Sequence, residues 1–243
     1  MTQTTRPDLR RPTVVLVHGA WHGPWCWDDL RPRLERLGWR TTAPQLASAS
    51  RTGTEPRPGL YDDAQVLAQH VDAIDGPVVL IGHSYGGAPV TEFAGRGTDK
   101  VTHLVYVAAY QPDVGESLYA MHGAPVPDDV SGVVPVPDNP VTMFYNDVAP
   151  DMAAEAVRQL VPQTVRSWSE DVKTAGWRTI SATYVLCEKD QALPPTMQEK
   201  FALRAGSLYR LASGHSPFLS MPGELADVLD RALTEAGVQQ TTT

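Results

Sequence analysis

Apolar runs of strand length alternate along this chain with stretches that have helical spacing. The strand-like runs fall at 13–17, 40–43, 77–81, 103–108, 181–187 and 207–211. The helical stretches fall at 25–37, 61–74, 85–96, 194–205 and 222–236. Runs that are apolar throughout indicate strands buried on both faces, and the helices between them indicate parallel connections. The pattern therefore predicts an α/β fold whose mostly parallel sheet is flanked by helices.

One segment, residues 111–177, interrupts this alternation. It carries eight prolines and scattered Met, Phe, Tyr and Trp, with weak helical segments only at 151–160 and 164–174. A long irregular insertion in a compact domain is usually functional or disordered. Because this one holds many aromatic residues, we expect an ordered cap over the strand ends. The sequence thus predicts a single domain at 13–237 that includes the cap, with flexible tails at 1–12 and 239–243.

Composition narrows the possible partners. The 243 residues carry a formal net charge of −8 and show no basic run, which argues against nucleic-acid binding. No apolar stretch has the length of a membrane span or of a signal-peptide core. We therefore expect a cytoplasmic protein that acts on a small molecule, without nucleic-acid or membrane partners; the sequence permits a homodimer.

The two cysteines, Cys26 and Cys187, lie far apart and lack the spacing of metal ligands or of a disulfide framework. Free cysteine is most often a small buried hydrophobic residue, and that is the interpretation for both. Cys26 keeps the alternative of lining a pocket, because it lies beside the motif at 18–27.

The most informative motif is Gly82-His83-Ser84-Tyr85-Gly86, which follows an apolar strand and precedes a helix. A serine flanked by glycines in such a strand-to-helix turn is typical of a nucleophile elbow. The small residues let the backbone bend sharply enough to expose the hydroxyl. Ser84 is therefore the candidate nucleophile.

A serine hydroxyl needs a general base, and that base needs an orienting carboxylate, in the chain order serine, acid, histidine. Of the seven histidines, His215 alone combines a glycine-flanked loop, a position after the last strand and the right order. The other six lie in motif loops, in a helix, at the start of a strand or in the cap: His18, His22, His70, His83, His103 and His122.

Asp190 is the leading candidate for the acid, because it follows a strand and lies just before a helix. Glu188 is an alternative in the same loop. Asp113 is another, because some hydrolases place the acid after the earlier strand. The other interpretation of Glu188 is an ordinary solvated loop residue.

A tetrahedral oxyanion also needs hydrogen-bond donors, and backbone N–H groups suit this role because they are fixed in place. Tyr85, directly after the nucleophile, is predicted to supply one. The second is expected from the loop after the first strand, with Ala20 the best candidate.

These motifs resemble the α/β-hydrolase superfamily, in the segments 14–27, 82–87 and 213–222. They resemble in particular the compact branch of plant methyl-ester esterases, hydroxynitrile lyases and related bacterial esterases. The resemblance spans 13 to about 235 and is weakest in the cap. It implies a small cap inserted after the sixth strand, a triad of Ser84, Asp190 and His215, backbone donors at Ala20 and Tyr85, and no cofactor or metal.

Two positions separate hydrolysis from lyase chemistry within this branch. Hydroxynitrile lyases of the rubber-tree type carry threonine where this chain has Gly19, and lysine where it has Ser216. A lysine can stabilise a departing cyanide, whereas glycine and serine supply no such charge. Haloalkane dehalogenases and epoxide hydrolases of this fold use a carboxylate nucleophile, which Ser84 argues against.

The sequence thus predicts a serine carboxylic-ester hydrolase (carboxylesterase-like) for a small to medium, apolar or aromatic ester. The alternatives are a lactonase, thioesterase or C–C bond hydrolase or lyase on the same triad, and a non-catalytic ligand receptor. The expected substrate-binding residues flank the catalytic positions or lie in the cap, where they are equally suited to filling the core: Trp21, Met121, Met143, Phe144, Trp168 and Phe218.

Overall fold

The computed structural model describes residues 11–50 and 55–238. Its main sheet has six strands in the order β2-β1-β3-β4-β7-β8, and every neighbouring pair is parallel. The strands are β1 (Thr13–Val17), β2 (Arg40–Thr42), β3 (Val78–His83), β4 (Val101–Val107), β7 (Ala182–Cys187) and β8 (Ser207–Leu211). All six predicted strands are present, and the α/β fold with a mostly parallel sheet is confirmed.

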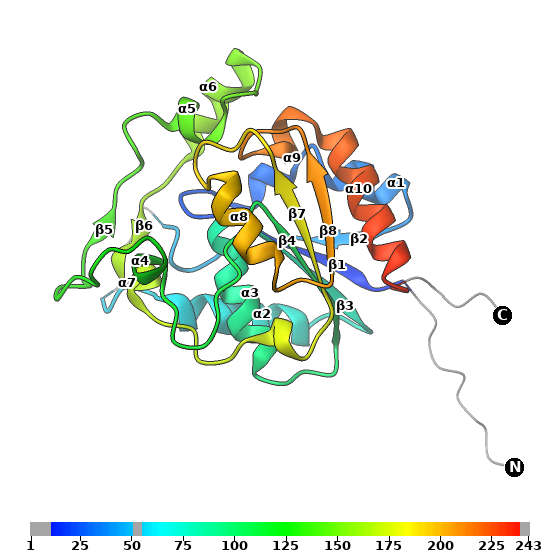
Figure 1. Ribbon diagram of the computed structural model, residues 1–243, viewed down its shortest axis with the longest axis horizontal. Helices are drawn as coiled ribbons and strands as arrows, with labels where there is room; N and C mark the ends of the chain where they lie inside the picture. Colours follow the sequence, from blue (N-terminus) through cyan, green and yellow to red (C-terminus); the bar gives the residue numbers. More distant parts are fainter. Residues whose placement is uncertain (1–10, 51–54, 239–243) are drawn as a thin grey trace, which may run out of the picture.

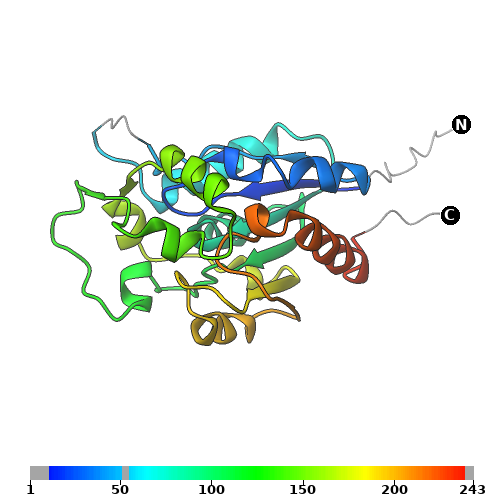
Figure 2. The same ribbon diagram turned by 90° about the horizontal axis from the view of Figure 1, so that it is seen from above.

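Helices cover both faces of this sheet (Figures 1 and 2). One face is covered by α2 (Leu60–Asp72), α3 (Gly87–Gly95) and α8 (Pro195–Ala202), and the other by α1 (Arg31–Arg36) and α10 (Pro222–Glu235). Alternate residues of β1 divide between the two layers: Val15 and Val17 pack on the first side, Val14 and Leu16 on the second. This alternation, with both sides apolar, explains why the strands read as continuous apolar runs.

The predicted helix at 25–37 is wrong as one element. It consists of a short 3-10 turn, η1 (Pro24–Trp27), and α1, separated by three residues. Pro32 lies in the first turn of α1, where its missing N–H is tolerated, whereas in the middle of a continuous helix it would break the ladder. The helix therefore restarts at Arg31. Two further short elements adjoin the predicted site, η2 (Ser84–Gly86) and α9 (Pro217–Ser220).

Most of the cap, residues 111–177, gathers at one end of the sheet, at the left of Figures 1 and 2, and its last residues run back beside α3, where Lys173 and Thr174 bond to Glu92. It follows β4, so its expected position after a sixth strand is wrong: only β7 and β8 come after it. Its elements are α4 (Leu118–Met121), β5 (Val133–Val134), α5 (Pro140–Phe144), α6 (Pro150–Gln159), β6 (Gln163–Thr164) and α7 (Val165–Ser169), and η3 (Gly176–Arg178) bridges its end. β5 and β6 form a separate antiparallel pair.

The helix expected at 164–174 ends early, at Ser169. Beyond it the backbone of Val172 pairs with the segment before α4, donating to Glu116 and accepting from Gly115 at 3.0 and 2.8 Å. These two hydrogen bonds replace those that a longer helix would make, so the chain runs extended here.

Most of the two expected tails, residues 1–10 and 239–243, lies outside the described residues. Arg11 donates to the Leu37 carbonyl at 2.6 Å and packs over the ring of Trp39, so it contacts the domain. No helix within residues 11–50 and 55–238 is both long and apolar enough to cross a membrane.

Candidate active site

Ser84 lies directly after β3, at the sharp turn that the glycine pattern predicts. Its φ of 50° is in the left-handed region, which is uncommon for a residue with a side chain and marks a strained turn. A Cβ added to Gly86 would come within 2.6 Å of the Val17 and His18 carbonyl oxygens. Position 86 must therefore be glycine for β1 and the elbow to approach each other this closely.

His215 and Asp190 meet at the carboxyl ends of β8 and β7. The Nδ1 atom of His215 lies 2.7 Å from Oδ2 of Asp190, and both side chains are buried. Because a carboxylate only accepts hydrogen bonds, Nδ1 carries the proton and Nε2 is left as an acceptor. Sequence reasoning paired these two residues, and the structure brings them together.

Three further N–H groups hold the Asp190 carboxylate. The backbone N–H groups of Ala192 and Leu193 donate to Oδ1 at 2.8 and 2.9 Å, and Gln198 Nε2 donates to Oδ2 at 2.9 Å. With His215, each carboxylate oxygen accepts two hydrogen bonds. This environment fixes the orientation of the Asp190 carboxylate, as the role of a candidate orienting group requires.

The alternative acids lie elsewhere. Asp113 forms an ion pair with Arg178 at 2.7 Å, and the exposed Glu188 lies 3.8 Å from Arg210. Of the other histidines, His103 bonds to Thr183 on the sheet and His70 to Thr42. The geometry therefore favours Asp190 and His215 over the alternatives that the sequence left open.

His83, which sequence reasoning placed only in the motif loop, contacts the candidate base His215 directly. Its Nε2 lies 2.9 Å from the backbone carbonyl oxygen of His215, so the ring nitrogen donates to it. Burial lowers the pKa of His83 well below its ordinary value, which keeps the ring neutral. His83 thus links β3, which leads to the candidate nucleophile Ser84, to the loop that carries His215.

The two predicted oxyanion donors, Ala20 and Tyr85, are buried and line the same cavity as Ser84 and His215. Two buried histidines fix the peptide groups around Ala20. His18 accepts from the Leu46 N–H at Nε2, so its Nδ1 donates to the Gly19 carbonyl at 2.9 Å. His22 Nδ1 donates to the Ala20 carbonyl at 2.8 Å.

Burial lowers the pKa of His18 to about 4 and that of His22 to about 3, so both rings are neutral near pH 7. A neutral ring has one donor and one acceptor nitrogen. In each ring the donor is used on the loop carbonyl, and His22 accepts from the Tyr145 hydroxyl, 2.9 Å away. The backbone of the loop after β1 is therefore held from both sides.

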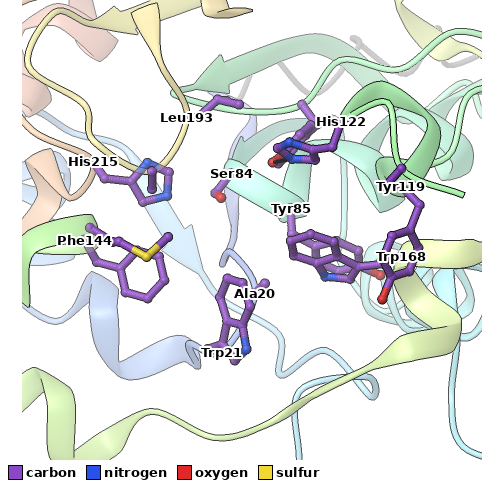
Figure 3. A pocket seen from close by; sticks show the side chains of 14 residues that line it. Ala20, Trp21, Ser84, Tyr85, Tyr119, His122, Phe144, Trp168, Leu193 and His215 are labelled. Carbon is purple, nitrogen blue, oxygen red and sulfur yellow. Dashed lines mark hydrogen bonds between the residues drawn. The ribbon is translucent and has the colours of Figure 1, made fainter. Parts of the chain in front are cut away.

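A cavity of about 240 Å³ opens at Ser84 and His215 (Figure 3). Its walls are mostly apolar, and the rings of Phe144 and Trp168 each lie 5.5 Å from that of Trp21. The lining comprises Ala20, Trp21, Ser84, Tyr85, Tyr110, Tyr119, His122, Ala124, Met143, Phe144, Trp168, Ala192, Leu193 and His215. Such a pocket, apolar with a few converging polar groups, is the usual form of a small-molecule site.

Four of the six expected substrate-binding residues line this cavity: Trp21, Met143, Phe144 and Trp168. Phe218 does not, because it is fully buried in the core, with its ring 4.9 Å from that of Trp27 and 4.8 Å from that of His83. Met121 packs against the core at the edge of α4 and is also absent from the lining.

Cys26 and Cys187 are free, buried thiols outside this cavity. Sequence reasoning did not select Tyr110, Tyr119, His122, Ala124, Ala192 or Leu193, which also line it. The segment that follows Asp190 signals only a turn before α8.

The cap contacts the loops that carry the candidate acid and base. Asn146 Nδ2 donates to the Lys189 carbonyl at 3.1 Å, next to Asp190. The N–H of Gly214, next to His215, donates to Asp147 Oδ2 at 2.6 Å. The cap is thus hydrogen-bonded to these loops as well as covering them.

Comparison with known proteins agrees with this architecture. Residues 14–228 match the alpha/beta hydrolase family. The chain is 30% identical to a carbendazim hydrolyzing esterase from Nocardioides sp. over 244 residues, covering 88% of this chain and 97% of the relative. It is 25% identical to methylesterase 1 of Arabidopsis thaliana over 258 residues, covering 90% and 95% respectively.

A crystal structure of a methylesterase protein from Arabidopsis superimposes with a TM-score of 0.77 at 26% identity. The alignment covers 92% of this chain and 99% of that one. The relatives named here are esterases, and the fold is a hydrolase fold. By the extent of the family match, together with its sheet, elbow and cavity, this chain belongs to the alpha/beta hydrolase family.

Proposed function

We propose that this protein is a serine carboxylic-ester hydrolase that uses Ser84, His215 and Asp190 as its triad. The observation that carries the proposal is the buried 2.7 Å hydrogen bond between His215 and Asp190, at a cavity that Ser84 also lines. A strained serine, an imidazole oriented by a carboxylate and an apolar pocket at which both side chains lie are the parts that acyl transfer needs.

The reaction begins when Ser84 Oγ attacks the acyl carbon of the ester and His215 Nε2 takes the serine proton. The N–H groups of Ala20 and Tyr85 hold the resulting oxyanion. The tetrahedral intermediate then collapses, and His215 protonates the departing alcohol, leaving an acyl-enzyme. His215 next deprotonates a water molecule, which attacks the acyl carbon. The second tetrahedral intermediate collapses as His215 returns this proton to Ser84 Oγ, and the carboxylic acid leaves.

The cavity favours a small apolar or aromatic substrate. Its volume of about 240 Å³ lies just below the roughly 300–1,000 Å³ typical of ligand pockets. Trp21, Phe144 and Trp168 line the cavity, so an aromatic group bound there can pack against their rings. Methylesterases are among the relatives, which makes a methyl ester of an aromatic acid a suitable first test substrate.

Ester hydrolysis is favoured over lyase chemistry by the space around Gly19. A Cβ at this position would lie 2.9 Å from the Ser84 Cβ and 3.0 Å from His83 Nδ1. The threonine of the rubber-tree type of lyase therefore does not fit beside this nucleophile without a shift. Ser216 also leaves the lyase's cationic position uncharged.

The test is turnover of p-nitrophenyl esters from acetate to decanoate, and of aromatic methyl esters, by wild type and Ser84→Ala. We expect hydrolysis of the short and aromatic esters, a decline with longer chains, and a loss of at least about 1,000-fold in Ser84→Ala. Ser131→Ala, an exposed cap serine bonded to Asp129, is the matched control. Unchanged turnover in Ser84→Ala would contradict the proposal.

A further inference from the structure

A group of buried polar side chains adjoins the cavity through Tyr85 and takes no part in the proposed proton transfers. It comprises Ser48, Asp63, Tyr85, Gln163 and Ser167, each with essentially no exposed surface. They come from the loop after β2, helix α2, the elbow, strand β6 and helix α7. Burying polar groups is costly unless every hydrogen bond is made, so such a group calls for an explanation.

Asp63 is the acceptor at one end of this network. The Tyr85 hydroxyl donates to its Oδ2 at 2.6 Å, and the Ser48 hydroxyl donates to the same oxygen. The backbone N–H of Ser48 donates to Oδ1 at 2.9 Å. The side chain of the residue directly after the nucleophile is thus anchored to α2.

Gln163 lies at the other end of this hydrogen-bond network. The Trp21 backbone N–H lies 3.4 Å from its Oε1, and because an N–H only donates, the amide oxygen must face it. Its Nε2 then donates to the hydroxyls of Ser48 and Ser167, at 2.7 and 2.8 Å. The Ser167 hydroxyl in turn donates a hydrogen bond to the Thr164 carbonyl at 2.8 Å. Both amide hydrogens and the amide oxygen of Gln163 are therefore used.

Trp21 needs such support. Its φ of 62° is in the left-handed region, which is rare for a bulky residue and is maintained only by the surrounding contacts. In addition to Gln163, the Val161 N–H donates to the Trp21 carbonyl at 2.9 Å, and Trp21 Nε1 donates to the Val134 carbonyl at 3.1 Å. All three partners belong to the cap.

We propose that Gln163 and Asp63 are positioning residues, which together hold the two oxyanion donors, Ala20 and Tyr85, at the spacing that the reaction needs. The chain of hydrogen bonds runs from the peptide group that joins Ala20 to Trp21, through Gln163, Ser48 and Asp63, to the side chain of Tyr85. Figure 3 shows Ala20 and Trp21 side by side at the cavity. This inference rests on the proposed function.

A network that served only the stability of the core would be replaceable by apolar side chains of similar volume at little cost. This one ends at the peptide group directly after Ala20 and at the side chain of Tyr85, on segments that are far apart in the sequence. It also makes the cap part of the catalytic apparatus, because Gln163 belongs to β6.

The test compares Gln163→Leu, Tyr85→Phe and the double variant with wild type. Leucine preserves most of the glutamine volume without its hydrogen bonds, and phenylalanine removes only the hydroxyl and leaves the Tyr85 backbone N–H in place. We expect each single variant to lower kcat on the order of tenfold, with KM within about twofold, because the oxyanion is present only after attack.

The affinity for a trifluoromethyl ketone, whose adduct with serine carries an oxyanion, should fall by the same factor as kcat. The double variant should lose less than the product of the single losses, because both changes break one connected network.

Thr91→Val is the control for stability. It removes a buried hydrogen bond, 2.8 Å long, between Thr91 on α3 and the Tyr106 hydroxyl on β4, and should lower Tm without changing kcat. If Gln163→Leu does not fold, Tyr85→Phe alone decides. A folded Tyr85→Phe or Gln163→Leu with a lower Tm but an unchanged kcat overturns the inference and leaves the proposed function standing. Turnover retained in Ser84→Ala overturns both.

Discussion

Replacing Asp190 by asparagine isolates the role of the carboxylate, because the two side chains have nearly the same shape. Each oxygen of Asp190 faces two N–H groups: those of Ala192 and Leu193 at Oδ1, and those of Gln198 and His215 at Oδ2. An asparagine must place its NH₂ group against one of these pairs. In either orientation two donors face a donor.

The two orientations have different costs. With the NH₂ group toward His215, Nδ1 of the imidazole must become the acceptor, so the ring takes the other tautomer. Nε2 then carries the proton and cannot accept the one from Ser84. With the NH₂ group toward Ala192 and Leu193, two buried backbone N–H groups lose their acceptor, at about 1–3 kcal/mol each. The first orientation disables the base, and the second destabilises the fold.

We therefore expect Asp190→Asn to lower kcat by about 10³- to 10⁴-fold, which corresponds to about 4–5.5 kcal/mol of transition-state stabilisation. KM should change little, because the carboxylate does not line the cavity. The assay is steady-state hydrolysis of a short p-nitrophenyl ester, with a thermal melt to show that the variant is folded.

Glu188→Gln and Asp113→Asn are the matched controls, since each removes one of the alternative acids. Both side chains pair with surface arginines and should leave kcat within about twofold. A folded Asp190→Asn that keeps more than a tenth of wild-type kcat, or a control that loses as much as Asp190→Asn, would refute the assignment of the acid.

Three further predictions follow from the geometry. Gly19→Ala would place a Cβ 2.9 Å from the Ser84 Cβ, so the nucleophile must shift. We expect kcat to fall by about 10- to 100-fold while Tm stays close to that of wild type. An unchanged kcat would show that the elbow tolerates the contact. Trp168→Ala removes one ring of the aromatic wall, worth about 1 kcal/mol, and should raise KM about fivefold for an aromatic ester while leaving KM for an acetate ester unchanged. Equal changes in KM for both esters would contradict an aromatic subsite. Stability should fall in acid, because the folded pKa values of His18 and His22, about 4 and about 3, lie below the unfolded value of 6.5, so the unfolded chain binds the proton first. Each ring should lower the free energy of unfolding by about 2 kcal/mol between pH 6.5 and pH 5, measured by urea unfolding. The raised pKa of Asp63, about 6, acts in the opposite direction and offsets part of this loss. A free energy of unfolding that rises steadily as the pH falls to 5 would contradict buried neutral rings.

Local pattern was sufficient to predict the sheet and the elbow. Continuous apolar runs fix strands that are buried on both faces, and a serine between glycines fixes the turn after β3. His215 and Asp190 followed from their positions after the last two strands, since parallel strands end at one edge. Such features depend on neighbours in the sequence or on the topology alone.

The supporting residues could not be found this way. Gln163 reaches Ser48, which is 115 residues earlier in the chain, and nothing around either residue signals the contact. The place of Phe218 was also open to either interpretation, because a residue three positions after His215 suits the pocket or the core. Packing against Trp27 and His83 decides for the core. In the cap, backbone pairing between distant segments overrides weak helical preference.

The most direct test of the central claim is the site of reaction with a serine-directed p-nitrophenyl phosphonate. Wild type and Ser84→Ala would be incubated with the reagent, weighed intact by mass spectrometry, and digested to locate the modified residue. The proposed triad predicts one adduct per wild-type chain, on Ser84, formed in step with the loss of esterase activity, and none on Ser84→Ala. An adduct on another residue, or full esterase activity in a chain modified at Ser84, would contradict Ser84 as the nucleophile.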